Sequence, residues 1–278
     1  MTTRSNPLAI FSPALFKGRT ALVTGGGRGI GRHVAMAFAR LGANVIIAGR
    51  TQEDLNPTAV EIRASGVDCL AVATDIRDTG AVDSLVEKVL ERFGAIDVLI
   101  NNAGGQYPAA PSAITDKGWR AVIDLNLNGT WNMCSRVGPH MTARGAGAIV
   151  NVVHIYALER GGAPFAHSGA ARAGVVNLTK SLAYYYARHG VTVNALAPGF
   201  VSTAGLREAE FKQLQHDDYE AAAIQDIPAH RLADPDEIAA IAIFLSSPGA
   251  RYINGATVVA DGALSLSNWT PWIDPETP

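Results

Sequence analysis

The sequence is poor in cysteine, in long hydrophobic runs and in charge. Its 278 residues include two cysteines, Cys69 and Cys134, too few for a disulfide framework and compatible with a reducing compartment. No apolar run reaches the roughly 18 residues of a membrane span. The first 16 residues also lack the apolar core of a secretion signal. We therefore expect a cytoplasmic globular protein that does not enter a membrane.

The low charge excludes further classes of protein. Lys and Arg number 23 and Asp and Glu 25, which gives a net charge of 23 − 25 = −2 without any long basic cluster. Binding of nucleic acid through a basic face is therefore not expected. Hydrophobic residues make up 48% of the chain, enough apolar surface to exclude intrinsic disorder. His154 and His167 lack the neighbouring ligands of a metal site, so no metal is predicted.

Short β-branched runs alternate with amphipathic helical stretches from end to end of the chain. Strands separated by helices form βαβ units and a parallel sheet. The sequence predicts an α/β fold: a single doubly wound, Rossmann-like domain over residues 1–278, with a parallel seven-stranded sheet and helices on both faces. The strands are predicted at 20–25, 44–49, 67–75, 96–104, 147–153, 191–199 and 256–262, with helices that include 30–42, 52–65, 84–94 and 234–247.

Two segments interrupt this pattern. Residues 200–230 are polar and irregular and follow the sixth strand, where a substrate lid would cover a ligand crevice. An ordinary connecting loop is the alternative. The tail at 264–278 holds Trp269 and Trp272 among prolines, and either covers a neighbouring subunit or extends freely.

A glycine-rich loop lies between the first strand and the first helix, with the spacing GxxxGxG. Glycines allow the backbone to turn tightly and to approach a pyrophosphate, while the helix N-terminus offers N–H groups and a positive dipole. The sequence therefore predicts a dinucleotide site at Gly25, Gly27, Arg28, Gly29, Ile30 and Gly31.

The end of the second strand indicates which dinucleotide is bound. An NAD site usually carries Asp or Glu there to accept a hydrogen bond from the ribose 2′-OH. Here the chain has Ala48, Gly49 and Arg50, with no acid. Arg50 and Arg28 are suited to a 2′-phosphate, so NADP(H) is predicted in preference to NAD(H).

These residues, together with Asn101–Gly104 after the fourth strand, resemble the short-chain dehydrogenase/reductase family. Further matching motifs follow in order at Asp75, Asn126, Pro198–Gly199 and Asp261–Gly262, so that the resemblance covers about residues 15–265. It implies the same fold and a homodimer or homotetramer. It also implies cofactor contacts at Asp75, Ile76, Asn102, Ala103, Gly104, Arg172, Pro198, Gly199 and Thr203.

The catalytic signature of that family is replaced here. The family has a Ser after the fifth strand, and a Tyr and a Lys one helical turn apart, where this chain has His154, Ser168 and Arg172. This departure argues against ordinary alcohol–ketone chemistry. The stretch 167–183 is similar to the trans-2-enoyl-CoA reductases, and residues 155–157 are similar to the 2,4-dienoyl-CoA reductases, in which an early Tyr is the catalytic acid. The resemblance therefore implies that Tyr156 is the acid.

Four residues are predicted to be catalytic: Tyr156, Asn126, Asn128 and Arg172. Tyr156 would supply a proton, and Arg172 would hold the nicotinamide ribose as a permanent cation. Asn126 and Asn128 are candidates to stabilise an enolate oxygen. Two residues apart on a helix, they point about 200° from one another, and Asn126 is favoured. His154 is an alternative proton donor, although a structural histidine is the simpler interpretation.

Three functions remain open on the sequence alone. The first is an NADPH-dependent reductase of the C=C bond of an enoyl- or dienoyl-thioester, with an acyl-CoA as substrate. Arg77 falls where the resemblance implies a contact to the phosphates of coenzyme A. The second is an NAD(P)-dependent carbonyl reductase or alcohol dehydrogenase, and the third is a cofactor-binding pseudoenzyme.

Overall fold

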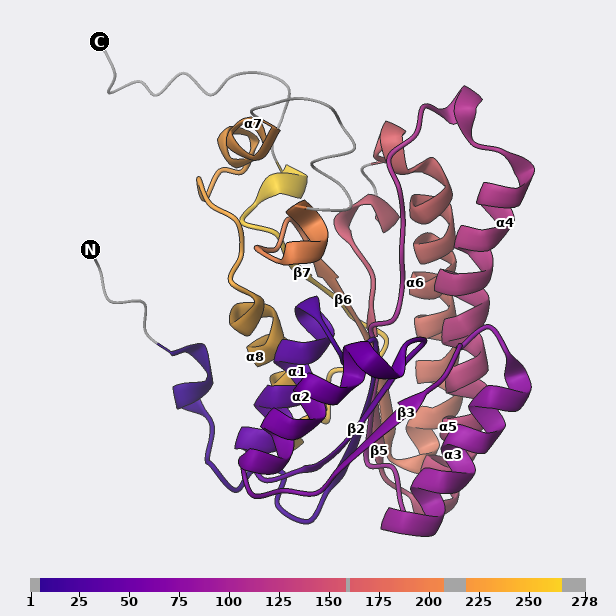
Figure 1. Cartoon of the computed structure of the whole chain (residues 1–278), viewed down its shortest axis with the longest axis vertical. Coiled ribbons are helices and arrows are strands. Elements are labelled where there is room, and N and C mark those ends of the chain that lie inside the picture. Colours follow the sequence, from indigo (N-terminus) through magenta and orange to yellow (C-terminus); the bar gives the residue numbers. More distant parts are fainter. Residues whose placement is uncertain (1–5, 159–160, 208–218, 267–278) are drawn as a thin grey trace.

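Seven strands form one parallel sheet, in the order β3-β2-β1-β4-β5-β6-β7 (Figure 1). The computed structural model describes residues 6–158, 161–207 and 219–266. The predicted α/β fold is confirmed, although most strands are shorter than the apolar runs that announced them. Their bounds are β1 Thr20–Thr24, β2 Asn44–Gly49, β3 Cys69–Ala73, β4 Val98–Asn101, β5 Gly147–Val152, β6 Val191–Pro198 and β7 Thr257–Ala260.

Helices cover both faces of the sheet (Figure 1). One face carries α1 (Gly29–Arg40), α2 (Gln52–Ala64) and α8 (Pro235–Ser246). The other face carries α3 (Thr79–Phe93), α4 (Asp116–Ile123), α5 (Gly129–Arg144) and α6 (Ala166–Tyr186). The short helix α7 (Tyr219–Asp226) lies beyond the carboxyl ends of the strands. Among the helices of the described residues, none has the length and apolar character that a membrane span requires.

The sheet separates two hydrophobic cores. In β1, Val23 packs into the core beneath α1 and α8, while its neighbour Leu22 packs into the core beneath α3 and α5. Ile47 and Ile46 of β2 divide in the same way. Because both faces of each central strand are buried, the strands are apolar without alternation.

The strand order reverses between β1 and β4. β1 pairs with β2 on one side and with β4 on the other, so the connections from these strands run in opposite directions. A crevice forms outside the carboxyl ends of the strands at such a switch point, and ligands of open α/β sheets bind there. The glycine loop after β1 and the segment after β4 both lie at this point.

A small apolar cluster covers the carboxyl edge of the sheet near β6. Leu206, Ala223, Ile227 and Leu232 pack with Ile155 and Leu264, and the rings of Tyr156 and Phe200 rest against them. Part of the predicted lid at 200–230 therefore packs as an ordered wall. Residues 208–218 of that lid, and residues 267–278 of the predicted tail, lie outside the described residues.

Candidate functional site

Two adjoining cavities open at the carboxyl edge of the sheet. One, of about 210 Å³, is lined by the glycine loop, the end of β2 and the segment after β4. The other, of about 480 Å³, continues from it along the ends of β5 and β6. They form one crevice across the switch point, because both are lined by Arg28, Arg50, Asn102, Gly104 and Leu125.

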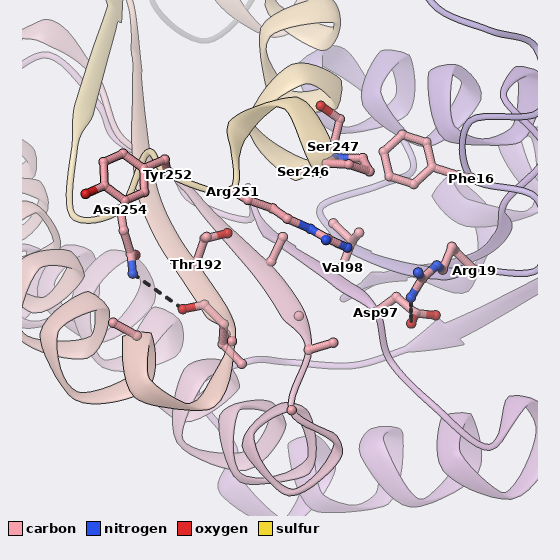
Figure 2. A pocket seen from close by; sticks show the side chains of 18 of the residues that line it. Phe16, Arg19, Asp97, Val98, Thr192, Ser246, Ser247, Arg251, Tyr252 and Asn254 are labelled. Atoms are coloured by element: carbon pink, nitrogen blue, oxygen red, sulfur yellow. Dashed lines mark hydrogen bonds and ion pairs between the residues drawn. The ribbon is translucent and has the colours of Figure 1, made fainter.

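A third cavity, of about 560 Å³, lies at the opposite edge of the sheet (Figure 2). The Asp97 carboxylate in its lining accepts hydrogen bonds from Arg19 and Arg144, each at 3.0 Å, and from the backbone N–H of Thr20 at 2.8 Å. The C-termini of α5 and α6 reach this edge, and arginines there balance the negative ends of the helix dipoles. These charges have a structural account, so the candidate site is the crevice at the carboxyl edge.

The glycine loop is held from behind by Asn102. Its Nδ2 donates to the carbonyl oxygen of Thr24 at 3.0 Å, and a Cβ on Gly25 would lie 2.8 Å from that nitrogen. A Cβ on Gly31 would overlap both the Gly25 carbonyl oxygen and the Asn102 amide. α1 starts at Gly29 without a side-chain cap, so its first N–H groups remain available to an anion. The loop therefore fits a dinucleotide pyrophosphate.

The smaller cavity carries positive charge at the end of β2. Arg50 and Arg28 both line it, together with Asp54 and Asp75. The Asp75 carboxylate is bound by the Arg77 guanidinium, with Nε 2.9 Å from Oδ1, and this hydrogen bond holds the pKa of Asp75 below its usual range. The interpretation of Arg77 as a coenzyme A contact is not supported, because its guanidinium pairs with Asp75.

The turn after β3 is fixed by Asn132, a residue that none of the sequence motifs includes. This buried side chain of α5 donates from Nδ2 to the carbonyl oxygen of Ile76 at 2.9 Å. Nothing in the local sequence announces the contact, because 56 positions separate the two residues. Ile76, a predicted cofactor residue, also lines the smaller cavity.

The segment after β4, with the predicted cofactor residues Ala103 and Gly104, lies against the predicted catalytic residues Asn126 and Arg172. Ala103 donates its N–H to Oγ1 of Thr24 at 3.0 Å, which ties the segment to the end of β1. A Cβ on Gly104 would lie 2.6 Å from Oδ1 of Asn126 and 2.7 Å from Nη2 of Arg172. Glycine is therefore required at this position so that both polar side chains can approach the backbone.

Asn126 and Asn128 do not lie on a regular helix, as the sequence predicted, but in a π turn at Asp124–Asn128 between α4 and α5. Nδ2 of Asn126 donates to the carbonyl oxygen of Val122 at 2.8 Å. The side chain thus takes the carbonyl oxygen that would accept the backbone N–H of Asn126 in a regular α-helix. The backbone here instead follows the wider hydrogen-bond spacing of a π-helix. Asn126 is buried and also donates to the carbonyl oxygen of Gly105 at 2.8 Å. Asn128 is exposed and donates to Asp124.

Tyr156 lies in the wall of the larger cavity, in a short 3-10 turn at Ile155–Ala157. Its ring stacks on Phe165 at a centroid distance of 5.8 Å and meets the edge of the His154 ring at 5.4 Å. The apolar cluster beside β6 packs against the same ring. Tyr156 is therefore a phenol between an apolar wall and a polar crevice.

Arg172 also lines this cavity. Nη1 donates to the carbonyl oxygen of Val152 at 3.0 Å, at the end of β5. Of the described residues that line the larger cavity, none is a carboxylate, and three are arginines: Arg28, Arg50 and Arg172. The crevice is therefore suited to anionic ligands.

His154 is part of a hydrogen-bond chain. Its Nε2 lies 3.1 Å from Oγ of Ser168, and that hydroxyl donates to Oε1 of Gln106 at 2.7 Å. Burial of the ring, with a smaller contribution from the positive charge of Arg172, lowers the pKa of His154 to about 3. The imidazole is therefore neutral at physiological pH, and the alternative that His154 supplies a proton is not supported.

His167, the second histidine considered in the sequence, is fully buried and meets the ring of Tyr107 edge-on at a centroid distance of 4.6 Å. Burial lowers its pKa, so its role is in packing. No group of His, Cys, Asp and Glu within the described ranges is placed to hold a metal ion.

The low pKa of His154 predicts a stability that depends on pH. An unfolded chain protonates this histidine near pH 6.5, whereas the folded protein does so only near pH 3. Between these values the unfolded state binds more protons, so the free energy of unfolding falls as the pH falls below 6.5. Urea titrations should show the wild type losing about 1–2 kcal/mol more between pH 7 and pH 5 than His154→Gln does. Parallel losses in the two proteins would contradict this account.

The remaining predicted cofactor residues line the larger cavity at the end of β6. They are Pro198, Gly199 and Thr203. Gly199 donates its N–H to the carbonyl oxygen of Ala260 at 3.0 Å, and Oγ1 of Thr203 accepts the N–H of Leu206 at 3.2 Å. Thr203 faces Gly29 across the crevice, since a Cβ on that glycine would lie 3.9 Å from its Cγ2.

The sequence of this chain was compared with those of known proteins. Residues 25–265 match the family model described as enoyl-(acyl carrier protein) reductase. A Bacillus subtilis protein named "Probable 2,4-dienoyl-CoA reductase" is 35% identical over 251 residues, which span 90% of this chain and 97% of that protein. The 3-oxoacyl-(acyl carrier protein) reductase FabG of Staphylococcus epidermidis is 35% identical over 249 residues, or 89% of this chain and 99% of that protein.

A solved structure supports the same relationship. A short-chain dehydrogenase from Bacillus anthracis superposes with a TM-score of 0.84 and 36% identity, covering 92% of this chain and all of that one. The sheet order and the matched sequence agree over nearly the whole length. The chain therefore belongs to the short-chain dehydrogenase/reductase family of oxidoreductases.

Proposed function

We propose that this oxidoreductase uses NADPH to reduce the C=C bond of an enoyl- or dienoyl-thioester, with an acyl-CoA as substrate. The observation that carries the proposal is the position of Tyr156. It is a phenol in the wall of the larger cavity, whereas Ser168, at the position of the usual family Tyr, is fully buried and hydrogen-bonded to Gln106.

The charge and shape of the larger cavity also favour this substrate. Its three arginines and the absence of a carboxylate among its described lining residues favour anionic ligands. The apolar cluster at Ile155, Leu206 and Leu264 provides a wall for an acyl chain. The Bacillus subtilis relative carries the name of a 2,4-dienoyl-CoA reductase, which points in the same direction.

In this mechanism each side chain has one task. The nicotinamide, when bound, supplies a hydride to the distal carbon of the conjugated double bond. Asn126 does not contact the substrate in the predicted way, because its Nδ2 donates both protons to the carbonyl oxygens of Gly105 and Val122; its role is to fix the Gly105 backbone beside the crevice. Tyr156 supplies the proton that reaches carbon. Arg172 holds the nicotinamide ribose and remains charged throughout.

A direct comparison of substrates tests the proposal. Oxidation of NADPH is followed with a trans-2-enoyl-CoA and with a 3-ketoacyl-CoA of the same chain length. Turnover of the enoyl ester alone is expected. Turnover of the ketone alone would favour a carbonyl reductase, the activity named for the Staphylococcus relative. Binding of NADPH without turnover of either would favour the pseudoenzyme.

Arg50 is proposed to select NADPH over NADH. In Arg50→Ala, the KM for NADPH should rise about 10- to 100-fold, because a charge-assisted contact to the 2′-phosphate is lost, while the KM for NADH changes little. Arg40→Ala, at the exposed end of α1, removes the same charge away from the crevice and serves as the control. Steady-state kinetics with both cofactors measure the effect. An unchanged preference in Arg50→Ala would show that the strand-end argument is wrong.

We further propose that the protein forms a homodimer or homotetramer. Trp131 on α5 and Tyr184 and Tyr185 on α6 are 47%, 81% and 61% exposed on neighbouring helices. Large aromatic side chains are enriched at interfaces between proteins, and the family resemblance implies such assemblies. Sedimentation velocity gives the number of subunits.

A further inference from the structure

The ring of Tyr156 is confined on several sides. Phe165 stacks on it with an interplanar angle of 17°, and a Cβ on Gly162 would lie 2.8 Å from its ring atoms. Both contacts come from the connection that leads into α6. The ring of His154 also meets the Tyr156 ring, at an interplanar angle of 71°. The orientation of Tyr156 therefore depends partly on what holds His154.

His154 is held by residues from two other parts of the fold. Ser168 belongs to α6, and Gln106 follows β4. A serine hydroxyl has one proton, and Ser168 donates it to Gln106, so the hydrogen bond between His154 and Ser168 uses the proton on Nε2 of the imidazole. This arrangement fixes one tautomer and one orientation of the ring. Ser168 is fully buried, so water does not compete for these bonds.

We propose that Gln106, Ser168 and His154 form a positioning chain that fixes the phenol of Tyr156 in the larger cavity. The inference rests on the proposed role of Tyr156 as proton donor. His154 and Ser168 act through Tyr156, since the histidine is neutral and the serine is buried. A reacting group displaced by about 1 Å loses roughly 100-fold in rate, so even a partial loosening of this phenol is measurable.

The neutral state of His154 is part of the device. The charged group that acts on the ring is the Arg172 guanidinium, and its positive charge disfavours an imidazolium. Among the described residues that line the cavity there is no carboxylate to offset this charge. A protonated ring would be repelled by Arg172 and would have two donors to satisfy. The chain of hydrogen bonds instead needs a single donor from the imidazole.

Removing the middle of the chain tests the inference. In Ser168→Ala, kcat with a trans-2-enoyl-CoA should fall about tenfold while the KM for NADPH stays within twofold, because the phenol is loosened and the cofactor contacts remain. Ser181→Ala is the matched control: it lies on the same helix, is exposed, and its hydroxyl donates only to the carbonyl oxygen of Asn177, at 3.2 Å. This control should behave as the wild type.

A second measurement needs no substrate. Tyrosine rings are labelled with ¹³C, and the Tyr156 signal is assigned from its loss in Tyr156→Phe. Ser168→Ala should shift or broaden this signal, and Ser181→Ala should not. An unchanged Tyr156 signal in Ser168→Ala would overturn the positioning chain.

Gln106→Glu provides a conservative variant with a distinct signature. The carboxylate still accepts from Ser168, so the Tyr156 signal should stay at its wild-type position. The added negative charge favours the imidazolium, so the pKa of His154, followed by NMR, should rise from its low value. A His154 titration unaffected by Gln106→Glu would mean that the chain does not form in solution.

The failure of this inference differs from the failure of the proposed function. Absence of thioester turnover in the wild type would refute the proposed function, and the Tyr156 and His154 signals would still decide the positioning chain. Wild-type turnover combined with full activity in Ser168→Ala would refute the positioning chain alone.

Discussion

Tyr156→Phe is expected to reduce kcat with a trans-2-enoyl-CoA by about 10²- to 10⁴-fold, the range for loss of a positioned general acid. The ring is stacked on Phe165 and packed against the apolar cluster beside β6, and phenylalanine keeps those contacts. The fold and the affinity for NADPH should therefore be retained. Single-turnover kinetics, with cofactor fluorescence as the measure of binding, separate the chemical step from the binding step.

Tyr252→Phe is the matched control for this variant. Tyr252 is fully exposed and lies outside the crevice, so loss of its hydroxyl should leave kcat unchanged. A Tyr156→Phe protein with wild-type turnover would eliminate Tyr156 as the acid. Since His154 is held neutral with a pKa of about 3, it would not be the replacement at neutral pH, and the proton would have to come from solvent or substrate.

The fold was predictable from sequence because its signals are local. The predicted strand at 44–49 is apolar at the successive positions 45–48, and in the structure it is β2, with these residues buried between two layers of helices. The GxxxGxG spacing has a strand before it and a helix after it, and that context placed the loop at the switch point. In each case the information lies within about ten consecutive residues.

The details of the site depended on contacts that are distant in sequence or hidden in side-chain geometry. The π turn at Asp124–Asn128 forms where Asn126 donates to the carbonyl oxygen of Val122, and its residues have the same pattern as a regular helix. Ser168 and Gln106 are 62 positions apart. No pattern in the chain relates them, because only the packing of α6 against the segment after β4 brings them together.

Arginines were the least predictable residues. Arg77 and Arg50 look equivalent in sequence, each a short distance past a strand at the same edge of the sheet. In the structure Arg77 pairs with Asp75, two positions earlier, whereas Arg50 lines both cavities. The partner of an arginine depends on which acidic or polar group lies within a few ångströms of its guanidinium. The spacing of residues along the chain does not give this distance.

Gly31→Ala is expected to abolish measurable binding of NADPH and to lower the free energy of unfolding by about 1–3 kcal/mol, the range for overpacking. A Cβ at this position would overlap the carbonyl oxygen of Gly25 and Nδ2 of Asn102. The first contact is with backbone, and the Asn102 side chain is itself fixed by its bond to Thr24. Neither neighbour can move without displacing the loop from the start of α1.

Gly80→Ala separates this effect from a general effect of adding a methyl group to a helix. Gly80 lies in the first turn of α3, and the nearest atom to a Cβ there is Oδ1 of Asp78, at an ordinary contact distance of 3.4 Å. This control should bind NADPH normally and gain about 0.4–1 kcal/mol, since alanine restricts the unfolded chain more than glycine does. Urea unfolding and fluorescence titration with NADPH measure both variants. If Gly31→Ala bound NADPH as tightly as Gly80→Ala, the glycine loop would be able to move aside for the added methyl group. Close packing behind the loop would then not determine the shape of the dinucleotide site.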